Sequence, residues 1–442
     1  MSRERDRIAK KREQNPIEEC NKIQRKFYPQ LFQKFEMIAD TRHSSYITYT
    51  TKEILTTLYY KAIGGIGSMQ KMTREFNEEL VVKNLYKFMG SKEKEYLPHG
   101  VTINEFLEKL EPKELENIQK DIVYQMIRRK TFDNAKVLKR WLVLIDGTEL
   151  DEGKQEKNKG YLSRTYHKGE EKEFTRYHRS VLEAKLYFGN DLVCSVATEW
   201  IENTKEYQKK KMTEEAMKQD CETKAFVRLA KKIKKKFQKL PIIIVADGLY
   251  VSHRVIEVCK ENGWEYLIRY KEGSAPSIEK EYQGIPEKEK EGGVEYINGV
   301  LFGDEEVNVI KYEETKIKNK KEKTTHFAWI TSIELTKRNG KKIVEAGRNR
   351  WKIENQGFNR QKRWQGNLEH ACSHNQNAQK NHYLMEQIAD FMKQLYEYFY
   401  LKKNEIKKEQ KNISSELLKS FGQQTTIGED IFSEETQSVT TN

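Results

Sequence analysis

Residues 141–148 read WLVLIDGT, an unbroken apolar run that leads into Asp146. A run of this kind predicts a strand that is buried on both faces of a sheet. Residues 240–248, LPIIIVADG, repeat the pattern and lead into Asp247. Ligands of open α/β sheets bind beyond the carboxyl ends of strands, so neighbouring strands of this kind would bring both aspartates into one crevice. The two stretches therefore predict an α/β sheet with a pair of acids at one edge.

The residues around each aspartate allow two interpretations. An Asp-Gly pair after a strand is most often a turn, but Gly147 and Gly248 would also let a bulky ligand approach the carboxylates. Two carboxylates can hold a pair of divalent metal ions, and a third carboxylate would complete such a site. The chain offers these candidates for the third acid: Glu149, Asp191, Glu199, Glu202, Glu354 and Asp390.

Glu354 is the candidate that dense positive charge surrounds. Residues 348–364 read RNRWKIENQGFNRQKRW, in which six basic side chains accompany this single acid. An exposed ion pair with Arg350, four residues earlier, would explain the acid with a gain of roughly 0.3–0.5 kcal/mol. A role as a metal ligand where DNA binds would explain both Glu354 and the basic side chains around it. We therefore expect Glu354 to be the third carboxylate.

Helical periodicity gives this stretch two faces. Trp351 and Phe358 form an apolar stripe that would pack the helix on the sheet. Gly357 shares the face of Glu354, and glycine is costly inside a helix. We therefore expect a notch beside the Glu354 carboxylate.

The composition favours a nucleic acid as the partner. The 442 residues carry a formal net charge of +13 and 34% charged residues, which is typical of a protein that binds a polyanion. The apolar runs fall well below the roughly 18 residues that a spanning helix needs. The N-terminal residues lack the apolar segment of a secretory signal. We expect a cytoplasmic protein without a membrane partner, in which Cys194, Cys221 and Cys259 are reduced core residues.

Changes in residue pattern divide the chain into a leader, a helical domain, a catalytic domain in two pieces, an insertion and a tail. The expected bounds are a basic leader over 1–20, a helical N-terminal domain over 21–138 that could bind DNA ends, a catalytic domain over 139–271 and 334–402, a β-rich insertion over 272–333, and a polar, disordered tail over 403–442.

The strands within these segments follow from turn signals. Residues 179–200 alternate like a hairpin that turns at Gly189-Asn190-Asp191, and Asn298-Gly299 predicts a second hairpin in the insertion. Amphipathic helices precede residues 240–248 and the apolar segment 265–270. Alternation of helix and buried strand predicts parallel pairing through crossover connections.

With Asp146, Asp247 and Glu354 assembled, the sequence resembles the DDE transposases of bacterial insertion sequences, in the family named after insertion sequence 4. Asp247 lies 101 residues after Asp146, and Glu354 lies 107 residues after Asp247. These long intervals suit the β-rich insertion that the family carries before its glutamate helix. The resemblance extends from about residue 139 to 400 and implies a ribonuclease H-like catalytic fold, a mixed sheet flanked by helices.

The family's sequence signature is kept in part. It consists of a tyrosine, an arginine, a glutamate and a lysine, with two, three and six residues between successive members. Arg350 and Glu354 match the middle pair, whereas Gly347 and Gln361 stand at the tyrosine and lysine positions. Lys362 lies one residue late, about 100° round a helix, where its flexible stem could still reach a phosphate.

The resemblance implies DNA transposition by phosphoryl transfer. Asp146, Asp247 and Glu354 would hold two Mg²⁺ ions, for which Mn²⁺ could substitute, and Asp146 would bridge both. Arg350 would orient Glu354 or neutralise phosphate. The implied partners are double-stranded DNA, as transposon ends and target, and a second copy of the chain in a synaptic complex. The protein would act at the nucleoid of a bacterial cytoplasm.

Further DNA contacts are expected in two basic stretches. Residues 161–179 alternate aromatic and basic side chains, as nucleic-acid-binding surfaces do, although a solvated basic loop explains them equally well. The expected contacts are Arg350, Arg360, Lys362, Arg363, Tyr166, His167, Lys168, Arg176, Tyr177 and Arg179.

Two alternatives to an active transposase stay open. A catalytically idle relative would bind DNA without metal-dependent cleavage, and Gly347 and Gln361 leave room for it. A nuclease of the same fold would cut DNA without joining a 3′ end to a target.

Overall fold

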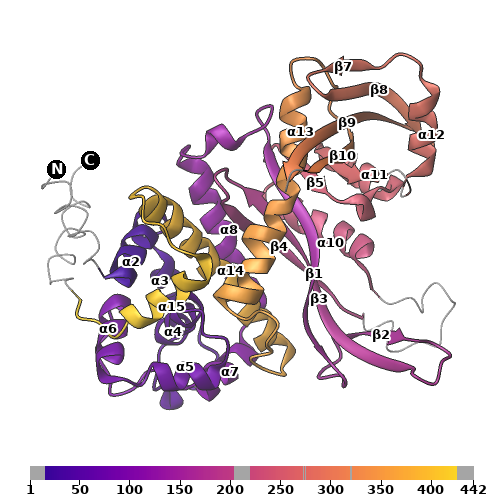
Figure 1. Ribbon diagram of the computed structural model, residues 1–442. Helices are drawn as coiled ribbons and strands as arrows, with labels where there is room; N and C mark the ends of the chain where they lie inside the picture. Colours follow the sequence, from indigo (N-terminus) through magenta and orange to yellow (C-terminus); the bar gives the residue numbers. More distant parts are fainter. Residues whose placement is uncertain (1–14, 204–219, 272, 274, 319–320, 426–442) are drawn as a thin grey trace, which may run out of the picture. The chain divides into compact units, whose positions relative to one another are not determined.

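A computed structural model describes residues 15–203, 220–271, 273, 275–318 and 321–425 (Figure 1). The chain divides into two units: unit 1 comprises Met1–Ile118 and Arg360–Asn442, and unit 2 comprises Gln119–Asn359. The expected catalytic domain placed all of 334–402 with the sheet. Residues from 360 onward instead pack with the N-terminal helices, because the long helix after residue 375 buries its apolar side chains among them.

Unit 1 is helical within its described residues. Its elements are α2 (Pro16–Phe27), α3 (Leu31–Glu36), η1 (Ser44–Tyr46), α4 (Thr51–Ile63), α5 (Met69–Glu75), α6 (Glu79–Met89), α7 (Gly100–Lys109), η7 (Gln361–Gln365), α14 (Gln376–Tyr396), η8 (Glu397–Lys402) and α15 (Gln410–Ser420). A further helix, α8 (Pro112–Arg128), spans the boundary between the units. α4 begins at a capping box formed by Thr50 and Glu53, which satisfies two of the free amides at its start.

The structure corrects both terminal predictions. α2 begins at Pro16 and buries Ile17 and Cys20, so the expected leader is ordered helix at its end. α15 lies within the expected disordered tail and buries Ile413 and Leu417. In both cases a few apolar residues at helical spacing suffice to bury one face of a helix. Residues 1–14 and 426–442 lie outside the described residues.

Unit 2 is built on a ten-stranded mixed sheet with the order β2-β3-β1-β5-β6-β10-β9-β8-β7, and β4 pairs with β3. The strands are β1 (Trp141–Gly153), β2 (Leu162–Tyr166), β3 (Phe174–Tyr187), β4 (Val193–Ile201), β5 (Ile242–Ala246), β6 (Glu265–Tyr270), β7 (Glu289–Glu291), β8 (Val294–Phe302), β9 (Glu305–Lys318) and β10 (Lys321–Thr331). The helical elements of this unit are η2 (Asp133–Ala135), α10 (Glu222–Lys236), η3 (Gly248–Tyr250), α11 (His253–Asn262), α12 (Pro276–Gly284), α13 (Gly340–Arg348), η5 (Asn349–Trp351) and η6 (Glu354–Phe358).

The central strands have the polarity expected from the sequence. β1 and β5 run parallel, β5 and β6 run parallel, and β3 is antiparallel to both β1 and β4. α11 joins β5 to β6, as a crossover connection requires. A mixed sheet with the order β4-β3-β1-β5-β6 and flanking helices fits the ribonuclease H-like fold.

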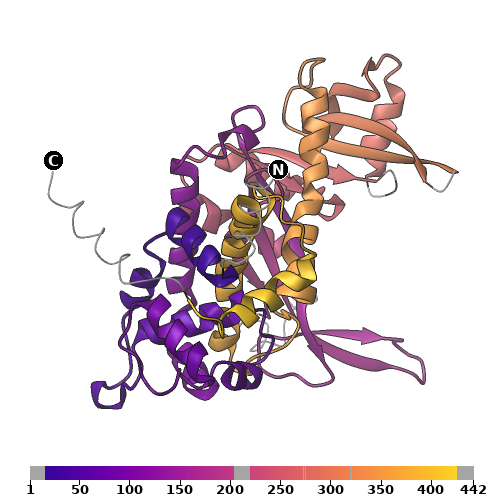
Figure 2. The same ribbon diagram turned by 60° about the vertical axis from the view of Figure 1, so that its left-hand side comes forward.

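The strands of residues 289–331 extend this same sheet. β10 pairs antiparallel with β6, and β9, β8 and β7 follow in order. Together with α12 and α13, these strands form one end of unit 2 (Figure 1 and Figure 2). The β-rich segment is therefore hydrogen-bonded to the edge of the central strands.

The two predicted hairpins have different outcomes. The turn at Gly189-Asn190-Asp191 is confirmed: all three residues have positive φ, and β3 pairs with β4 on either side. Asn298-Gly299 is instead a bulge within β8, where the register shifts between Ile297 and Val300. The Asn298 amide exchanges hydrogen bonds of 2.9 Å with the backbone of Leu335, which holds the bulge in the strand. The chain reverses after the end of β8, at Gly303, whose φ is +61°.

Candidate active site

The two aspartates lie on neighbouring parallel strands. β1 and β5 pair up to Leu144 and Val245, and the acids come two residues after these positions. Asp247 directly follows the end of β5, whereas β1 continues past Asp146 to Gly153 and pairs there with β3. Asp247 is the N-cap of η3, and its Oδ1 accepts a hydrogen bond of 3.0 Å from the amide of Leu249. The turn and the acid pair therefore coexist at this residue.

Glu354 lies in a helical stretch that changes its pitch. The stretch passes from α13 through η5 into η6, a π-helical turn that begins at Glu354. π-helical turns occur frequently at functional sites. Phe358 is buried against the sheet as expected, whereas Trp351 is 43% exposed and does not pack there. The predicted stripe is wrong for Trp351 because it assumed 100° per residue throughout.

Arg350 connects the first and third acids. Its side chain is 5% exposed, and its Nη1 donates to Asp146 Oδ2 at 3.0 Å and to Glu354 Oε1 at 3.5 Å. Its guanidinium also lies 4.5 Å from the ring centroid of Trp351. Nε has no hydrogen-bond partner among the described residues. Arg350 is therefore the cation that holds the two carboxylates near each other.

The site carries more negative than positive charge. Burial raises the pKa of Asp146 to about 7; Arg350 opposes this rise, and Glu354, Asp247 and Glu222 add to it. A further cation would relieve this repulsion, and carboxylate oxygens are the ligands that Mg²⁺ and Mn²⁺ prefer. The donor set fits such ions in its chemistry. Among the described residues, however, no three His, Cys, Asp or Glu side chains are spaced to hold a metal ion.

Glu222, in the first turn of α10, is an acid that the sequence did not single out. Its carboxyl carbon would lie 2.4 Å from a Cβ at Gly147, so it occupies the space that this glycine leaves. The Tyr250 hydroxyl donates to Glu222 Oε2 at 2.7 Å. Burial raises the pKa of Glu222, and Asp247 raises it further. Gly147 therefore accommodates a side chain of this protein; residue spacing gave no sign of it.

The space beside Gly357, where we expected an open notch, is also filled by a side chain of the protein. A Cβ at Gly357 would lie 3.1 Å from Cε of Lys185, a buried residue of β3. The Lys185 ammonium lies 5.9 Å from the ring centroid of Phe358. Gly357 thus lets the η6 helix approach the sheet rather than opening a cavity beside Glu354.

Packing explains why the signature tyrosine is absent. A Cβ at Gly347 would lie 2.5 Å from the indole of Trp329, which is 1% exposed. A tyrosine at position 347 would collide with this ring. Trp329 therefore fills the volume that the signature side chain would need.

The signature lysine position is part of a buried network in unit 1. Gln361 is fully buried; it exchanges amide hydrogen bonds of 2.9 and 3.0 Å with Gln387 and donates to Asp390 at 3.0 Å. Lys362 is 19% exposed and pairs with Glu369 at 3.2 Å. Gln361 is thus a structural residue.

Two of the residues expected to contact DNA, Arg360 and Arg179, are buried. Arg360 is fully buried between Asp390 and Glu397, and Arg179 is buried against Asp151 at 2.6 Å. Both guanidiniums are already neutralised, so neither is available to a phosphate. His167, Lys168 and Arg363 are exposed, and Lys362, Tyr166, Arg176 and Tyr177 are partly exposed.

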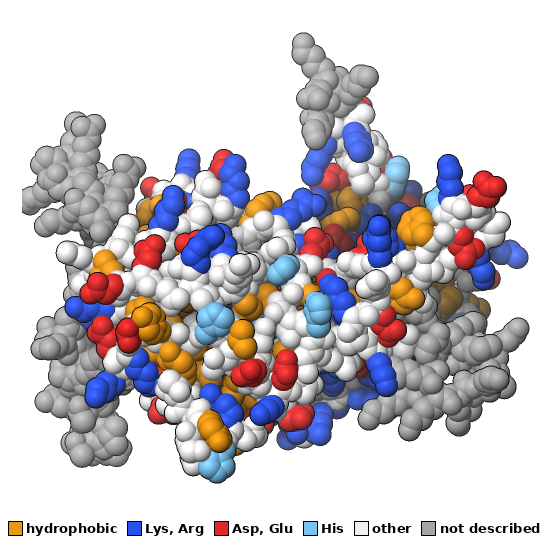
Figure 3. Space-filling view, turned by 90° about the horizontal axis from the view of Figure 1, so that it is seen from below, with side chains coloured by type: hydrophobic (Ala, Val, Ile, Leu, Met, Phe, Trp, Pro, Cys, Tyr) orange, Lys and Arg blue, Asp and Glu red, His pale blue; other side chains and the backbone are white. Residues whose placement is uncertain are grey.

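Charge on the surface is mixed. Figure 3 shows Lys and Arg side chains interspersed with Asp and Glu over the face in view. Cys194 and Cys259 are buried as expected, whereas Cys221 is exposed just before α10, where the chain enters the helix from the surface. Every helix within the described parts of the chain is too short or too polar to cross a membrane.

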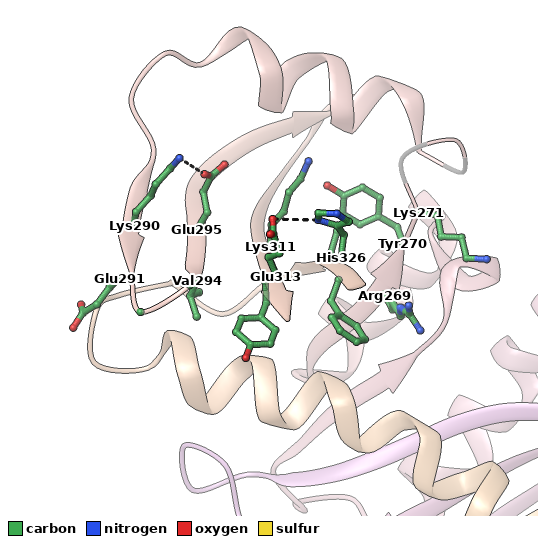
Figure 4. A pocket seen from close by; sticks show the side chains of 15 residues that line it. Arg269, Tyr270, Lys271, Lys290, Glu291, Val294, Glu295, Lys311, Glu313 and His326 are labelled. Carbon is green, nitrogen blue, oxygen red and sulfur yellow. Dashed lines mark ion pairs between the residues drawn. The ribbon is translucent and has the colours of Figure 1, made fainter. Parts of the chain in front are cut away.

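Arg269, at the end of β6, was also missed. Burial lowers its pKa, Arg350 lowers it further and Asp247 opposes the change, so its charge is felt at the acids. Its guanidinium lies 5.1 Å from the ring of Phe327, and that of Arg348 lies 5.2 Å from the same ring. Arg269 also lines a hollow of about 780 Å³ among β6 to β10 (Figure 4). Lys290–Glu295 and His326–Glu313 pairs already satisfy much of the charge there.

Known proteins resemble this chain in part. Residues 218–389 match the family model "Transposase DDE domain", a span that includes Asp247 and Glu354. The chain is similar to a solved structure titled "Cryo-EM structure of piggyBac transposase synaptic complex with hairpin DNA", with 10% identity, a TM-score of 0.41, and coverage of 97% of this chain and 86% of that chain. No curated protein matches the chain. The matched span and the two acids within it support a DDE transposase as the class of this protein.

Proposed function

We propose that this protein is a transposase of the family named after insertion sequence 4, which cleaves DNA at the ends of its element and joins the 3′ ends to a target. The observation that carries this proposal is the position of Asp146 and Asp247 on neighbouring parallel strands, with Glu354 linked to Asp146 through Arg350. The match to a transposase DDE domain over the second and third acids supports it.

Asp146, Asp247 and Glu354 would hold two Mg²⁺ or Mn²⁺ ions. Such ions supply an activated water or 3′-hydroxyl and stabilise the leaving oxygen of a phosphoryl transfer. Arg350 keeps the Asp146 and Glu354 carboxylates near each other and provides a positive group for a phosphate. The Glu222 carboxylate, which accepts from the Tyr250 hydroxyl, fills the space at Gly147, next to Asp146.

The proposed DNA partner would contact exposed basic and aromatic side chains. Arg363 and Lys362 follow the Glu354 helix, and the expected contacts Tyr166, His167, Lys168, Arg176 and Tyr177 belong to the β2–β3 ribbon and its turn. We propose terminal inverted repeats as the specific sites, and a homodimer that holds two ends together.

The test is a cleavage and joining assay with DNA that spans the borders of the encoding element. Purified protein is expected to nick this DNA only with Mg²⁺ or Mn²⁺, and to join the 3′ ends to a second duplex. Asp146→Asn and Asp247→Asn should abolish both steps and retain binding. Cleavage by either variant, with its fold verified by circular dichroism, would remove that residue from the site.

One observation favours a second candidate, a catalytically idle relative that binds DNA. Arg350 already bonds to both Asp146 and Glu354, so a protein cation partly neutralises the acids. Binding of the border DNA without nicking at any Mg²⁺ or Mn²⁺ concentration would select this candidate. Cleavage without joining would select a nuclease.

A further inference from the structure

One face of the β2–β3 ribbon combines aromatic and basic side chains. The strand register places Arg164 opposite Arg176 and Tyr166 opposite Phe174. Residues two apart share a face, so these four side chains lie together, whereas the Thr165–Thr175 pair lies on the other face. The Tyr166 and Phe174 rings stack with centroids 5.0 Å apart, and Phe174 is 44% exposed. We name this surface the ribbon face.

The ribbon face leads into a hollow next to the acids. Leu162 and His178 are the next pair on the same face, and both line a hollow of about 560 Å³. Gly147 and Glu222 also line it, directly beside Asp146. This volume lies within the range of small-ligand pockets. A strand of DNA lying along the ribbon face would therefore pass close to the proposed site of cleavage.

His178 is a largely buried histidine that borders this hollow. The residue is 6% exposed, and its Nδ1 is buried without a hydrogen-bond partner among the described residues. Burial lowers the pKa of His178, which favours the neutral ring. Because Nδ1 is buried, other atoms of the ring face the hollow, and a planar base could pack against them.

Hydrogen-bonding groups decide which part of a nucleotide the hollow suits. Glu149, Asp220 and Glu222 line it. Arg164 and Arg228 already pair with the first two of these acids, and Glu222 accepts from the Tyr250 hydroxyl. The amino and ring N–H groups of a base can donate to carboxylates and hydroxyls, whereas a phosphate offers only acceptors. Arg164 pairs with Glu149, and Arg176 lies 3.8 Å from Glu152. These pairs are exposed, so a phosphate can compete for the guanidiniums at little cost.

We propose that the ribbon face and the adjoining hollow bind a single-stranded segment of the DNA substrate. Bases stack on Tyr166 and Phe174, phosphates contact Arg164 and Arg176, and one base enters the hollow toward His178. This inference rests on the proposed function and adds the form of DNA that the site receives. Unpaired strands arise next to a cleavage site once the duplex opens.

The first test measures binding of a labelled single strand of about 15 nucleotides to the full chain by fluorescence anisotropy, without metal ions. Phe174→Ala removes an exposed ring and is expected to weaken binding about tenfold, within the range for one base stacked on an aromatic side chain. The matched control is Thr175→Ala on the opposite face of the same ribbon, which should bind like the wild type. Equal affinities for the two variants would overturn the ribbon part of the proposal.

The second test probes the hollow through Cys221, which is exposed and lines it. The same strand should slow alkylation of Cys221 by N-ethylmaleimide several-fold, as measured by mass spectrometry. Cys372 in unit 1 is the internal reference and should react at an unchanged rate. Thr223→Met narrows the hollow from a partly exposed position and should weaken binding of the strand. An unprotected Cys221 together with unchanged binding by Thr223→Met would overturn the base pocket.

The proposed transposase function and the proposed single-strand binding can be refuted independently of each other. Wild-type protein that cleaves border DNA but binds the strand no better than Phe174→Ala retains the proposed function and loses this inference. Protein that binds the strand as described but never cleaves retains the ribbon face and loses the transposase activity.

Discussion

Two clusters of charged side chains differ in their balance of acids and bases. The acid site of unit 2 comprises Asp146, Asp247, Glu354, Glu222 and Arg350. The buried network of unit 1 comprises Arg360 and Lys393 with Asp390, Glu386 and Glu397. Arg360 pairs with Glu397 at 2.6 Å and with Asp390 at 3.3 Å, and Lys393 donates to backbone carbonyls of the same unit.

Each cluster holds an acid whose pKa is raised to about 7, but the neighbours differ. Burial is the largest cause for both Asp146 and Glu386. At Glu386, three bases oppose the rise and one acid, Asp390, adds to it. At Asp146, three acids add to the rise and one base, Arg350, opposes it. A raised pKa alone therefore does not mark a functional site. What supports the proposed role of the acid site is its excess of acids over bases, which leaves a place for a cation.

The largest expected effect separates the two clusters by activity. Glu354→Gln should lower the rate of DNA cleavage by roughly 10³-fold, because the proposed metal ions lose a carboxylate ligand. Glu386→Gln changes the same functional groups in the buried network and should leave the rate within severalfold of wild type. Single-turnover cleavage of border DNA measures both. Equal losses in the two variants would end the distinction between the clusters.

The next effect separates them by stability. Arg360→Met leaves the buried Asp390 and the partly exposed Glu397 without this cation, and should lower the free energy of unfolding by about 3–5 kcal/mol. Arg350→Met should cost less, because Asp146 can take up a proton near neutral pH. Urea unfolding followed by circular dichroism compares the variants. A greater loss from Arg350→Met would show that the acid site, too, stabilises the fold.

The pKa of Asp146 predicts how stability varies with pH. The folded protein keeps the Asp146 proton up to about pH 7, whereas the unfolded chain releases it near 3.8. Stability contributed by this group is therefore lost as the pH rises from about 4 to 7, by at most about 4 kcal/mol.

Asp146→Asn removes this titration, so its unfolding free energy should fall less than that of the wild type between pH 5 and 8, measured without metal ions. Glu386→Gln removes the corresponding titration from the buried network, and the pH dependence of its unfolding free energy is measured for comparison. A pH profile unchanged by Asp146→Asn would contradict the raised pKa.

The smallest effect concerns two basic side chains that follow the Glu354 helix in sequence, the partly exposed Lys362 and the exposed Arg363. Lys362→Ala and Arg363→Ala should each weaken DNA binding modestly and reduce the slope of log affinity against log salt by roughly one unit for each phosphate that the wild-type side chain neutralises. Arg360→Lys, in the buried network, should leave the slope unchanged. Titration at several salt concentrations checks this order. An unchanged slope in both surface variants would exclude these side chains from the DNA interface.

The sequence alone determined the parallel strands and their acids. Apolar runs before Asp146 and Asp247 encode buried strands locally, and the positive charge around Glu354 marks it without any knowledge of the fold. The turn at residues 189–191 is likewise local, because it depends on residues that tolerate positive φ. The polarity of the central sheet followed from these elements.

Tertiary structure decided what fills the space around the acids. Glu222 beside Gly147, Lys185 beside Gly357 and Trp329 beside Gly347 come from distant segments, and a missing side chain does not show which neighbour replaces it. Burial likewise separated Arg360 from Arg363, although both are basic residues of one stretch. The charge of a residue is written in the sequence, but its desolvation and its partners arise only when remote elements pack against it.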